Sequence, residues 1–486
     1  MQATYRAMIG PENDKAYRYL VVMGRLFGQL ERRLGAPTQR VGRDAYVLGR
    51  GWAELKHEYI YKYGITARQF NSVYNSVAGK VSSVKENMKY RAQDLAGRIE
   101  SLEQVIKKKE KARQKAVERL GKLKQGTKAW EITVEKLARI KFVLHQKKRR
   151  LRNLLQRLDN LTGDIAGERY RICFGSRKLF KAQYNLEANR FRDHSEWLER
   201  WRRARSSSIF VLGSKDESFG NQTCTYGSDN TLRIRVAERF TKEFGTYTEI
   251  PEVVFAYGQE QLDLARQPVR RKDAKGRSKK VYKSISYRFV CREGRWYVHA
   301  TVERKDPDPV TSGWNGAVGL DLNYGFLAVG EVDRHGNPLG EFKIPVPMRD
   351  RTTEQIEAAL GDALKEAVSF AVQRGKPVAI ESLDFSRKKQ SLGEQGAGYA
   401  RMLSVLVYAK YQQMAASAAA RAAVELIRRN PFATSVAGQL KFMVRYGLSS
   451  HGAAACVIAR RGLDFRLERT VASSVLKLPE RKRTTR

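Results

Sequence analysis

The last third of the chain alternates apolar strands with amphipathic helices, and this order restricts the fold more than any other feature. AVGLDLN (317–323), FLAVGEVD (326–333) and LGEFKIPV (339–346) have the length and composition of three consecutive strands. Further apolar strands then alternate with helix patterns. The order strand-strand-strand-helix-strand-helix-strand-helix predicts an α/β domain built on one central sheet.

The elements after the third strand have recognisable bounds. The amphipathic segment 353–375 ends at a glycine, which is a typical helix stop. KPVAIESLDF (376–385) and VELIRRN (424–430) are apolar enough to be buried strands, and a helix pattern at 401–422 lies between them. The segment 435–462 predicts helix up to the end of the domain core.

Two acidic residues lie in these apolar strands. Asp321 lies within GLDLN, and Glu381 lies near the end of VAIESLDF. A carboxylate in a buried strand is costly unless it is paired or binds a metal ion, and for either acid alone a salt bridge at a strand edge is the alternative. Because the element order would place both strands side by side, the two carboxylates predict a two-metal site for phosphodiester cleavage with Mg²⁺. Asp384 lies nearer the surface and fits a structural partner.

A histidine stands at the start of the last helix pattern. Ser449 and Ser450 can cap this helix, and His451 is the ionisable side chain among the small residues of SSHGAAAC. Its ring could reach both acid-bearing strands, where an imidazole can ligate Mg²⁺ weakly or act as a base. The alternative is a helix-start residue that faces solvent. With the acids before it, the predicted catalytic and metal-binding set is Asp321, Glu381 and His451.

The charge of the chain indicates a polyanionic partner. Its 486 residues include 92 Lys and Arg against 51 Asp and Glu, a net charge of +41. This exceeds what solubility requires, so nucleic acid is the leading partner. A membrane surface is the competitor, but the basic residues are not gathered on one amphipathic helix. No leader and no run of about 18 apolar residues is visible, so no membrane partner is expected.

The cysteines favour a reduced, cytoplasmic protein without zinc. None forms a CxxC pair, and none lies near a histidine at zinc-ligand spacing. A disulfide framework is also unexpected in so long a chain with so few cysteines. The four are Cys173, Cys224, Cys291 and Cys456.

A short strand at TYRAMI (4–9) precedes a region with helical periodicity. Leucine and isoleucine recur every three or four residues over 137–161, after a break near Gly126, and predict a helical packing seam. This seam could pack within the chain or across a dimer, so monomer and homodimer both stay open. The one-signed segment HQKKRRLR (145–152) favours nucleic-acid backbone contact over a merely solvated helix face.

The pattern changes to short strands after about residue 165. SSIFVLGS (207–214), LRIRV (232–236) and EVVFAY (252–257) predict strands, and 281–292 with 295–304 predict a hairpin around Glu293-Gly294. The basic loop between residues 267 and 280 suits phosphate contact.

These changes divide the chain into five ranges. They are a first strand of the β-rich domain (1–12), a helical domain with a basic hairpin (13–165), the β-rich domain (166–312), a nuclease-like domain (313–475) and a basic tail (476–486). The residues predicted to contact nucleic acid are Lys147, Lys148, Arg149, Arg150, Arg270, Arg271, Lys279, Lys280, Arg387, Lys388 and Lys389.

The motifs carry a resemblance to a known family. GLDLN, IESLDF, NPFATSVAG and the alanine-rich helix, in this order, resemble the RuvC-like nuclease domain of transposon-encoded TnpB proteins and of the type V CRISPR effectors derived from them. The resemblance covers about 313–465. YGITARQFNSV (63–73) and RICFGSRKLF (171–180) are similar to segments of the recognition and wedge domains of that family.

The resemblance implies a multidomain α+β protein. Its parts would be a helical recognition domain, a β-rich wedge with an oligonucleotide-binding-like barrel, and an RNase H-like RuvC α/β domain. It implies an RNA-guided DNA endonuclease in a prokaryotic cytoplasm, associated with the nucleoid, with guide RNA and double-stranded target DNA as partners. Asp321 and Glu381 would be the first and second catalytic acids, with Mg²⁺ as the cofactor and Mn²⁺ as the alternative ion.

The chain departs from the family in two places. The family usually has two CxxC pairs before the last helix, whereas residues 430–447 contain no cysteine, so no zinc is expected. The family usually has aspartate where this chain has His451, and some related RuvC-type resolvases carry histidine there. Two other functions stay open: an RNA-guided DNA-binding protein or transcriptional blocker that cleaves little, and a plain RNA-binding protein or transposase without a guide.

Overall fold

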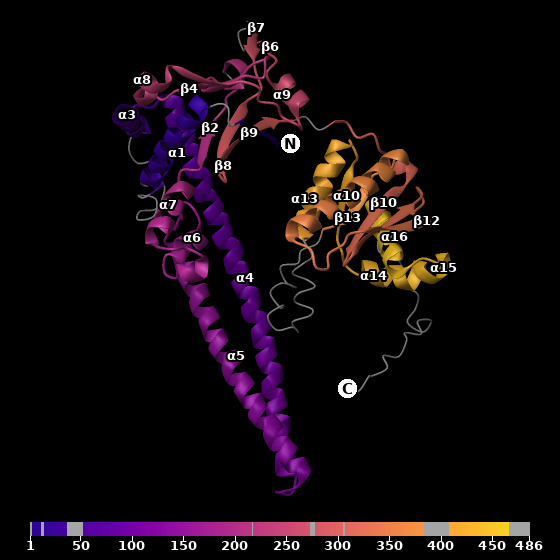
Figure 1. Cartoon of the computed structure of the whole chain (residues 1–486). Coiled ribbons are helices and arrows are strands. Elements are labelled where there is room, and N and C mark those ends of the chain that lie inside the picture. Colours follow the sequence, from indigo (N-terminus) through magenta and orange to yellow (C-terminus); the bar gives the residue numbers. More distant parts are fainter. Residues whose placement is uncertain are drawn as a thin grey trace. The chain divides into compact units, whose positions relative to one another are not determined.

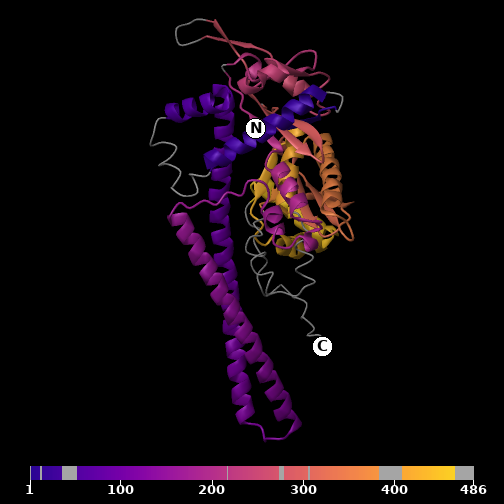
Figure 2. The same cartoon turned by 60° about the vertical axis from the view of Figure 1, so that its left-hand side comes forward.

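The structure is a computed structural model of a multidomain α+β chain (Figures 1 and 2). Its contacts divide the chain into a first unit, residues 1–96 and 152–305, and a second unit, residues 97–151 and 306–486. The five ranges predicted from the sequence stay predictions. The residues that the structure describes are 2–10, 14–35, 52–215, 217–272, 278–304, 307–382 and 408–465.

An antiparallel four-stranded sheet organises the first unit, in the order β1-β9-β8-β2. One face is apolar and buried, with Val298 and Phe289 fully enclosed, because residues alternate along each strand. The turn between β8 and β9 at Glu293 and Gly294 has positive φ at both residues, which confirms the predicted hairpin. The strands are β1 (Gln2–Met8), β2 (Ser208–Val211), β8 (Ile285–Arg292) and β9 (Arg295–Glu303).

Two smaller sheets complete the β structure of this unit, and one predicted strand is wrong. Residues 252–257 form no strand, because the backbone of Val253 donates to Asn230 and accepts from the Tyr226 hydroxyl instead of pairing in a ladder. The strand lies just before, at β5. The small sheets contain β3 (Cys224–Tyr226), β4 (Leu232–Arg235) and β5 (Tyr247–Ile250), and the hairpin β6 (Val269–Lys272) with β7 (Ser278–Val281).

Helices account for most of residues 14–166, as predicted. The long helices α4 (Ala67–Gly121) and α5 (Lys128–Ala166) form a hairpin in both views (Figures 1 and 2). Leu137, Ile140 and Leu144 are buried, so the predicted seam packs within the chain. The other helices of the first unit are α1 (Asp14–Gly35), α3 (Trp52–Tyr63), α6 (Arg177–Ala182), α7 (His194–Ala204), α8 (Thr241–Phe244) and α9 (Gln259–Ala265).

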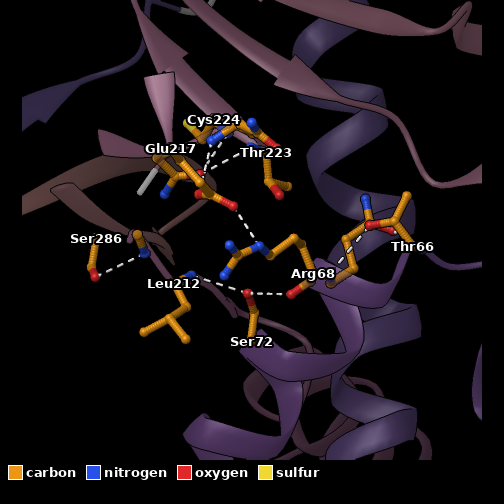
Figure 3. Close-up of polar contacts among 12 residues, drawn as sticks. Thr66, Arg68, Ser72, Leu212, Glu217, Thr223, Cys224 and Ser286 are labelled. Carbon is orange, nitrogen blue, oxygen red and sulfur yellow. Dashed lines mark hydrogen bonds and ion pairs between the residues drawn. The ribbon is translucent and has the colours of Figure 1, made fainter. Parts of the chain in front are cut away.

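Polar contacts fix the start of α4 to the β structure of the same unit (Figure 3). Arg68 forms an ion pair with Glu217, whose side chain is only 2% exposed. The hydroxyl of Ser72 accepts from the backbone N–H of Leu212 at 3.0 Å and donates to the Arg68 carbonyl. The first turns of α4 are therefore held to the segment that follows β2.

A five-stranded mixed sheet organises the second unit, in the order β12-β11-β10-β13-β14. The first three strands along the chain pair antiparallel, whereas β10, β13 and β14 pair parallel. Each predicted strand of this region is confirmed, with shorter bounds for most. The strands are β10 (Ala317–Asn323), β11 (Phe326–Val332), β12 (Pro338–Pro345), β13 (Val378–Glu381) and β14 (Leu426–Arg429).

Helices cover both faces of this sheet (Figure 1). On one face, α10 (Thr353–Gln373) and α13 (Tyr408–Arg421) share a core with Leu320 and Ile380. On the other, α16 (Ser450–Gly462) crosses so closely that a Cβ on Gly319 would lie 1.9 Å from the Ala455 carbonyl oxygen. Small residues in the strand and in α16 permit this approach.

The segment between β14 and α16 differs from the continuous helix predicted for 435–462. It contains α14 (Thr434–Ala437), the π-helix η7 (Gly438–Met443) and α15 (Val444–Tyr446). Gly447 then has φ +65° and ends the helix before Ser449 caps α16. The predicted helix at 401–422 is described from residue 408 onward.

Candidate functional site

Asp321 and Glu381 lie at the same level of adjacent parallel strands. Leu320 pairs with Ile380 in the register of β10 and β13, and the two acids directly follow this pair. Gly319 faces α16, so Asp321, two residues on, faces the same way, and Glu381 matches it in register. The sheet therefore brings both predicted acids to one edge, on the face that α16 covers.

Asp321 is largely buried, with 16% of its side chain exposed. Burial raises the pKa of its carboxyl, while a hydrogen bond from Asn323 and the nearby His451 act in the opposite direction. Asn323 donates from Nδ2 to Oδ2 at 2.9 Å, and His451 Nδ1 lies 3.7 Å from the same oxygen. The Asp321 carboxyl therefore lies in a low-dielectric environment with few hydrogen-bond donors to compensate its charge.

Glu381 is 9% exposed and has a specific hydroxyl donor. Thr434 donates from Oγ1 to Oε1 of Glu381 at 2.5 Å and is itself 4% exposed. Thr434 belongs to the NPFATS segment, and sequence reasoning gave it no role at the site. A threonine a few residues after a parallel strand, at the start of the next helix, is the signal that could have suggested it.

The charges of both acids affect the pKa of a buried tyrosine. Tyr411 in α13 is 1% exposed, and its hydroxyl has no hydrogen-bond partner among the described residues. Burial raises its pKa well above the usual value, and the charges of Asp321 and Glu381 raise it further. Both carboxylates therefore lie within electrostatic range of one buried phenol.

His451 lies in the first turn of α16, where a network positions it. Glu341 accepts hydrogen bonds from the backbone N–H of Ser449 at 2.7 Å and from its hydroxyl at 2.9 Å. The Ser449 hydroxyl accepts from Gly452 N–H and so caps the helix. The His451 ring meets Phe326 edge to face at 5.2 Å between centroids, and its side chain is 44% exposed.

The three predicted site residues are not assembled as one metal-ligand cluster. Within the described ranges, no group of three or more His, Cys, Asp or Glu side chains is close enough to hold a metal ion. His451 approaches Asp321, whereas Glu381 is held by Thr434. The oxygen donors of Asp321 and Glu381, side by side at one sheet edge, do have the chemistry that Mg²⁺ takes from proteins.

A second feature is a basic groove of about 880 Å³ in the first unit. Small or polar residues of α4 form one wall, at the helical spacing Asn75, Gly79, Ser83 and Asn87. Sequence analysis did not predict this groove, because its walls come from separate segments. Its cationic lining residues are Lys80, Arg91, Arg171, Arg177 and Arg288.

The basic residues predicted to contact nucleic acid have different settings. On the hairpin, Lys148 pairs with Glu110 at 2.6 Å, so the segment 145–152 is less one-signed in space than in sequence, while Arg149 is exposed. Lys147 and Arg150 also have interaction partners.

The remaining predicted cations lie in a hairpin or beyond the described ranges. Strands β6 and β7 place Arg270 opposite Lys280 and Arg271 opposite Lys279. Arg387, Lys388 and Lys389 lie outside the described residues, as does Asp384.

Comparisons with known proteins leave the family open. No known family model matches the sequence, and no curated protein gives a significant match. Among the described helices, none has the length and apolarity needed to cross a membrane.

Proposed function

We propose that this chain is an RNA-guided DNA endonuclease with a single RuvC-like, Mg²⁺-dependent site, similar to TnpB proteins and type V CRISPR effectors. The observation that carries the proposal is the common level of Asp321 and Glu381 on β10 and β13. Two carboxylates at adjacent ends of parallel strands, near a helix bearing a third polar residue, suit phosphodiester cleavage.

The sheet order supports an RNase H-like assignment for the second unit. An antiparallel meander followed by two parallel strands, with helices on both faces, is the arrangement that such a domain requires. The four-stranded sheet of the first unit would correspond to the wedge with its oligonucleotide-binding-like barrel. The basic groove beside it would hold phosphates of the guide RNA or the target DNA.

Each residue of the site would have a separate role. Asp321 and Glu381 would hold Mg²⁺, which supplies an activated water and stabilises the leaving oxygen when bound. Thr434 fixes the orientation of the Glu381 carboxylate by donating to its Oε1 atom. Glu341 and Ser449 hold the start of α16, and thereby the position of His451 beside Asp321.

A second candidate is an RNA-guided DNA-binding protein or transcriptional blocker with weak or no cleavage. The observation in its favour is that His451, where the family usually has aspartate, is directed at Asp321 and is far more exposed than either acid. A site with two acids and a displaced third group would bind metal poorly.

One experiment separates the two. The protein is purified with its co-expressed RNA and incubated with a matching plasmid and Mg²⁺, alongside Asp321→Ala. Cleavage by the wild type and none by the variant supports the endonuclease. Equal gel shifts without cleavage by both proteins support the binding protein. Failure of any discrete RNA to copurify contradicts both guided functions.

A further inference from the structure

The outer face of the four-stranded sheet in the first unit carries a row of basic side chains. Arg6 in β1 lies opposite His299 in β9, and His299 lies opposite Arg288 in β8. Arg292 and Arg295 face each other at the end of β8 and β9 and share this face by strand alternation. We call Arg6, Arg288, Arg292, Arg295, Tyr297 and His299 the basic sheet face.

The opposite face of the same strands is core, so the direction of these side chains is fixed. Ala7, Val298 and Phe289, each the neighbour of a residue in the row, are 4% exposed or less. Arg6 and Arg288 are exposed, and His299 is half-buried between them. A one-residue slip in register would bury the arginines, so the packing of the sheet holds the row outward.

Few acidic residues oppose this face, although Glu31 of α1 lies within electrostatic range of Arg288. The four strands contain one acid, Glu303, and Lys215 pairs with it at 3.1 Å. Four arginines within one sheet face repel one another, and a bound polyanion would relieve that repulsion.

His299 occupies the middle of the row, between Arg6 and Arg288. Its Nε2 atom is buried and has no hydrogen-bond partner among the described residues. Burial lowers the pKa of the imidazole, and the charges of Arg292, Arg6 and Arg288 lower it further. Because Nε2 is enclosed, a phosphate at this position would accept from the guanidinium groups of Arg6 and Arg288 on either side and not from the ring.

Two cation–aromatic pairs lie beside this position. The Arg6 guanidinium is 5.3 Å from the Tyr297 ring centroid, and the Arg288 guanidinium is 4.9 Å from that of Phe210. Flat surfaces of this kind stack unpaired bases, whereas a duplex keeps its bases inside. Phe210 and Arg288 also line the basic groove, so the face and the groove are continuous.

We infer that the basic sheet face binds single-stranded nucleic acid, with one phosphate between Arg6 and Arg288. This site goes beyond the proposed function, because it needs neither Mg²⁺ nor a matching guide. Single-stranded RNA and single-stranded DNA share the chemistry, and the test separates them.

The test uses the full chain after removal of copurified nucleic acid at high salt. Fluorescence anisotropy measures binding of a labelled 20-nucleotide RNA of random sequence, the same sequence as DNA, and the corresponding duplex, without Mg²⁺. Arg6→Gln/Arg292→Gln removes two charges from the face. Arg192→Gln/Lys242→Gln removes two exposed charges elsewhere in the same unit and serves as the matched control.

The face variant should bind single strands at least about tenfold more weakly than the control. Its log-affinity should also fall less steeply with log salt, by about 0.7 for each phosphate that the variant no longer neutralises. Stronger binding of RNA than DNA would identify RNA as the ligand, and the reverse would identify DNA. Equal affinities of the face and control variants, or equal binding of duplex, would overturn the inference.

A second measurement uses the wild-type chain, so its result does not depend on whether the variants fold. A 4-thiouridine RNA, or a 4-thiothymidine DNA, is photocrosslinked to the wild-type chain, and the linked peptides are identified by mass spectrometry. The inference requires crosslinks within 285–303 or 2–8. Crosslinks confined to other segments would contradict it, and the result is independent of whether the second unit cleaves DNA.

Discussion

Asp321 and Glu381 directly follow a residue pair, Leu320 and Ile380, that joins two parallel strands in register. This relationship places the two carboxylates at one level of the sheet. It also gives each acid a different partner: Asn323 and His451 for Asp321, and Thr434 for Glu381. The two halves of the site can therefore be changed separately.

Removal of the Asp321 charge should stabilise the metal-free fold and abolish cleavage. Burial raises the pKa of this carboxyl in the folded state, so the unfolded chain releases the proton more readily. The stability of the wild type therefore falls as pH rises from about 3.9, the unfolded value, through the folded pKa. Asp321→Asn should lack this fall in stability and should have a higher melting temperature than the wild type at neutral pH. Its cleavage rate should be lower by about 100-fold or more.

Thermal unfolding between pH 4 and pH 8 without metal measures the first effect, and plasmid cleavage measures the second. Asp333→Asn is the control, because its carboxyl has a lowered pKa and caps an exposed turn. That variant should lose stability at neutral pH and keep cleavage. An Asp321→Asn protein that melts below wild type at neutral pH would show that the charge is compensated.

Removal of the Thr434 hydroxyl should weaken metal binding through Glu381. In Thr434→Val the shape is kept, but the buried Glu381 carboxylate loses the hydrogen bond from this hydroxyl, at a cost of about 1–3 kcal/mol of stability. Removing such an orienting partner usually lowers metal affinity about 10- to 100-fold. Mn²⁺ titration by electron paramagnetic resonance measures the affinity directly.

Thr434→Ser restores the donor and should recover most of the affinity. Ser435→Ala changes the neighbouring hydroxyl and should leave Mn²⁺ binding unchanged. Equal Mn²⁺ affinity in Thr434→Val and wild type would mean that Glu381 does not bind the ion.

The fold of the second unit was accessible from the sequence because its information is local. Alternating apolar strands and amphipathic helices mark the elements, and Asp321 and Glu381 are visible as charges within apolar runs. The element order also predicted that the two acid-bearing strands lie side by side, and their pairing confirms this. The strand prediction for EVVFAY was wrong although it used the same signal. Val253 and Phe255 are buried with strand periodicity, but the backbone of Val253 bonds to Asn230 and to the Tyr226 hydroxyl and not to another strand.

The supporting residues of the site could not be read from the sequence. Glu341 meets Ser449 across 108 positions of the chain, and Thr434 meets Glu381 across 53. Nothing in the local pattern of either segment signals its partner. The basic groove is similar, because Lys80 and Arg288 become neighbours only when α4 packs on the sheet.

A double-mutant cycle should show that the lack of a side chain at Gly452 makes room for the Glu341 carboxylate. A Cβ on Gly452 would lie 0.9 Å from the Glu341 carboxylate, so Gly452→Ala must displace that side chain from Ser449. Gly452→Ala and Glu341→Ala should each break the hydrogen bonds between Glu341 and Ser449, at a cost of about 1–2 kcal/mol. The double variant should cost about the same as either alone, because both changes break one interaction.

Chemical denaturation of the four proteins measures the cycle. Gly340→Ala, at a neighbouring glycine with open space around it, is the control and should cost little. Additive destabilisation in the double variant would show that the glycine and the carboxylate act independently.

The ion pair between Arg68 and Glu217 should be required for the first unit to fold normally (Figure 3). Glu217 is 2% exposed, so Arg68→Ala leaves a buried carboxylate without its cation. Breaking such a pair typically costs about 3–5 kcal/mol, whereas replacing both partners by apolar residues is often nearly neutral. Urea unfolding should therefore show a large destabilisation for Arg68→Ala and a smaller one for Arg68→Met/Glu217→Leu.

Arg18→Ala is the control. It breaks the exposed pair with Asp14 and should cost less than about 1 kcal/mol of stability. If Arg68→Ala were no more destabilising than Arg18→Ala, the contact would have to be a surface pair in solution.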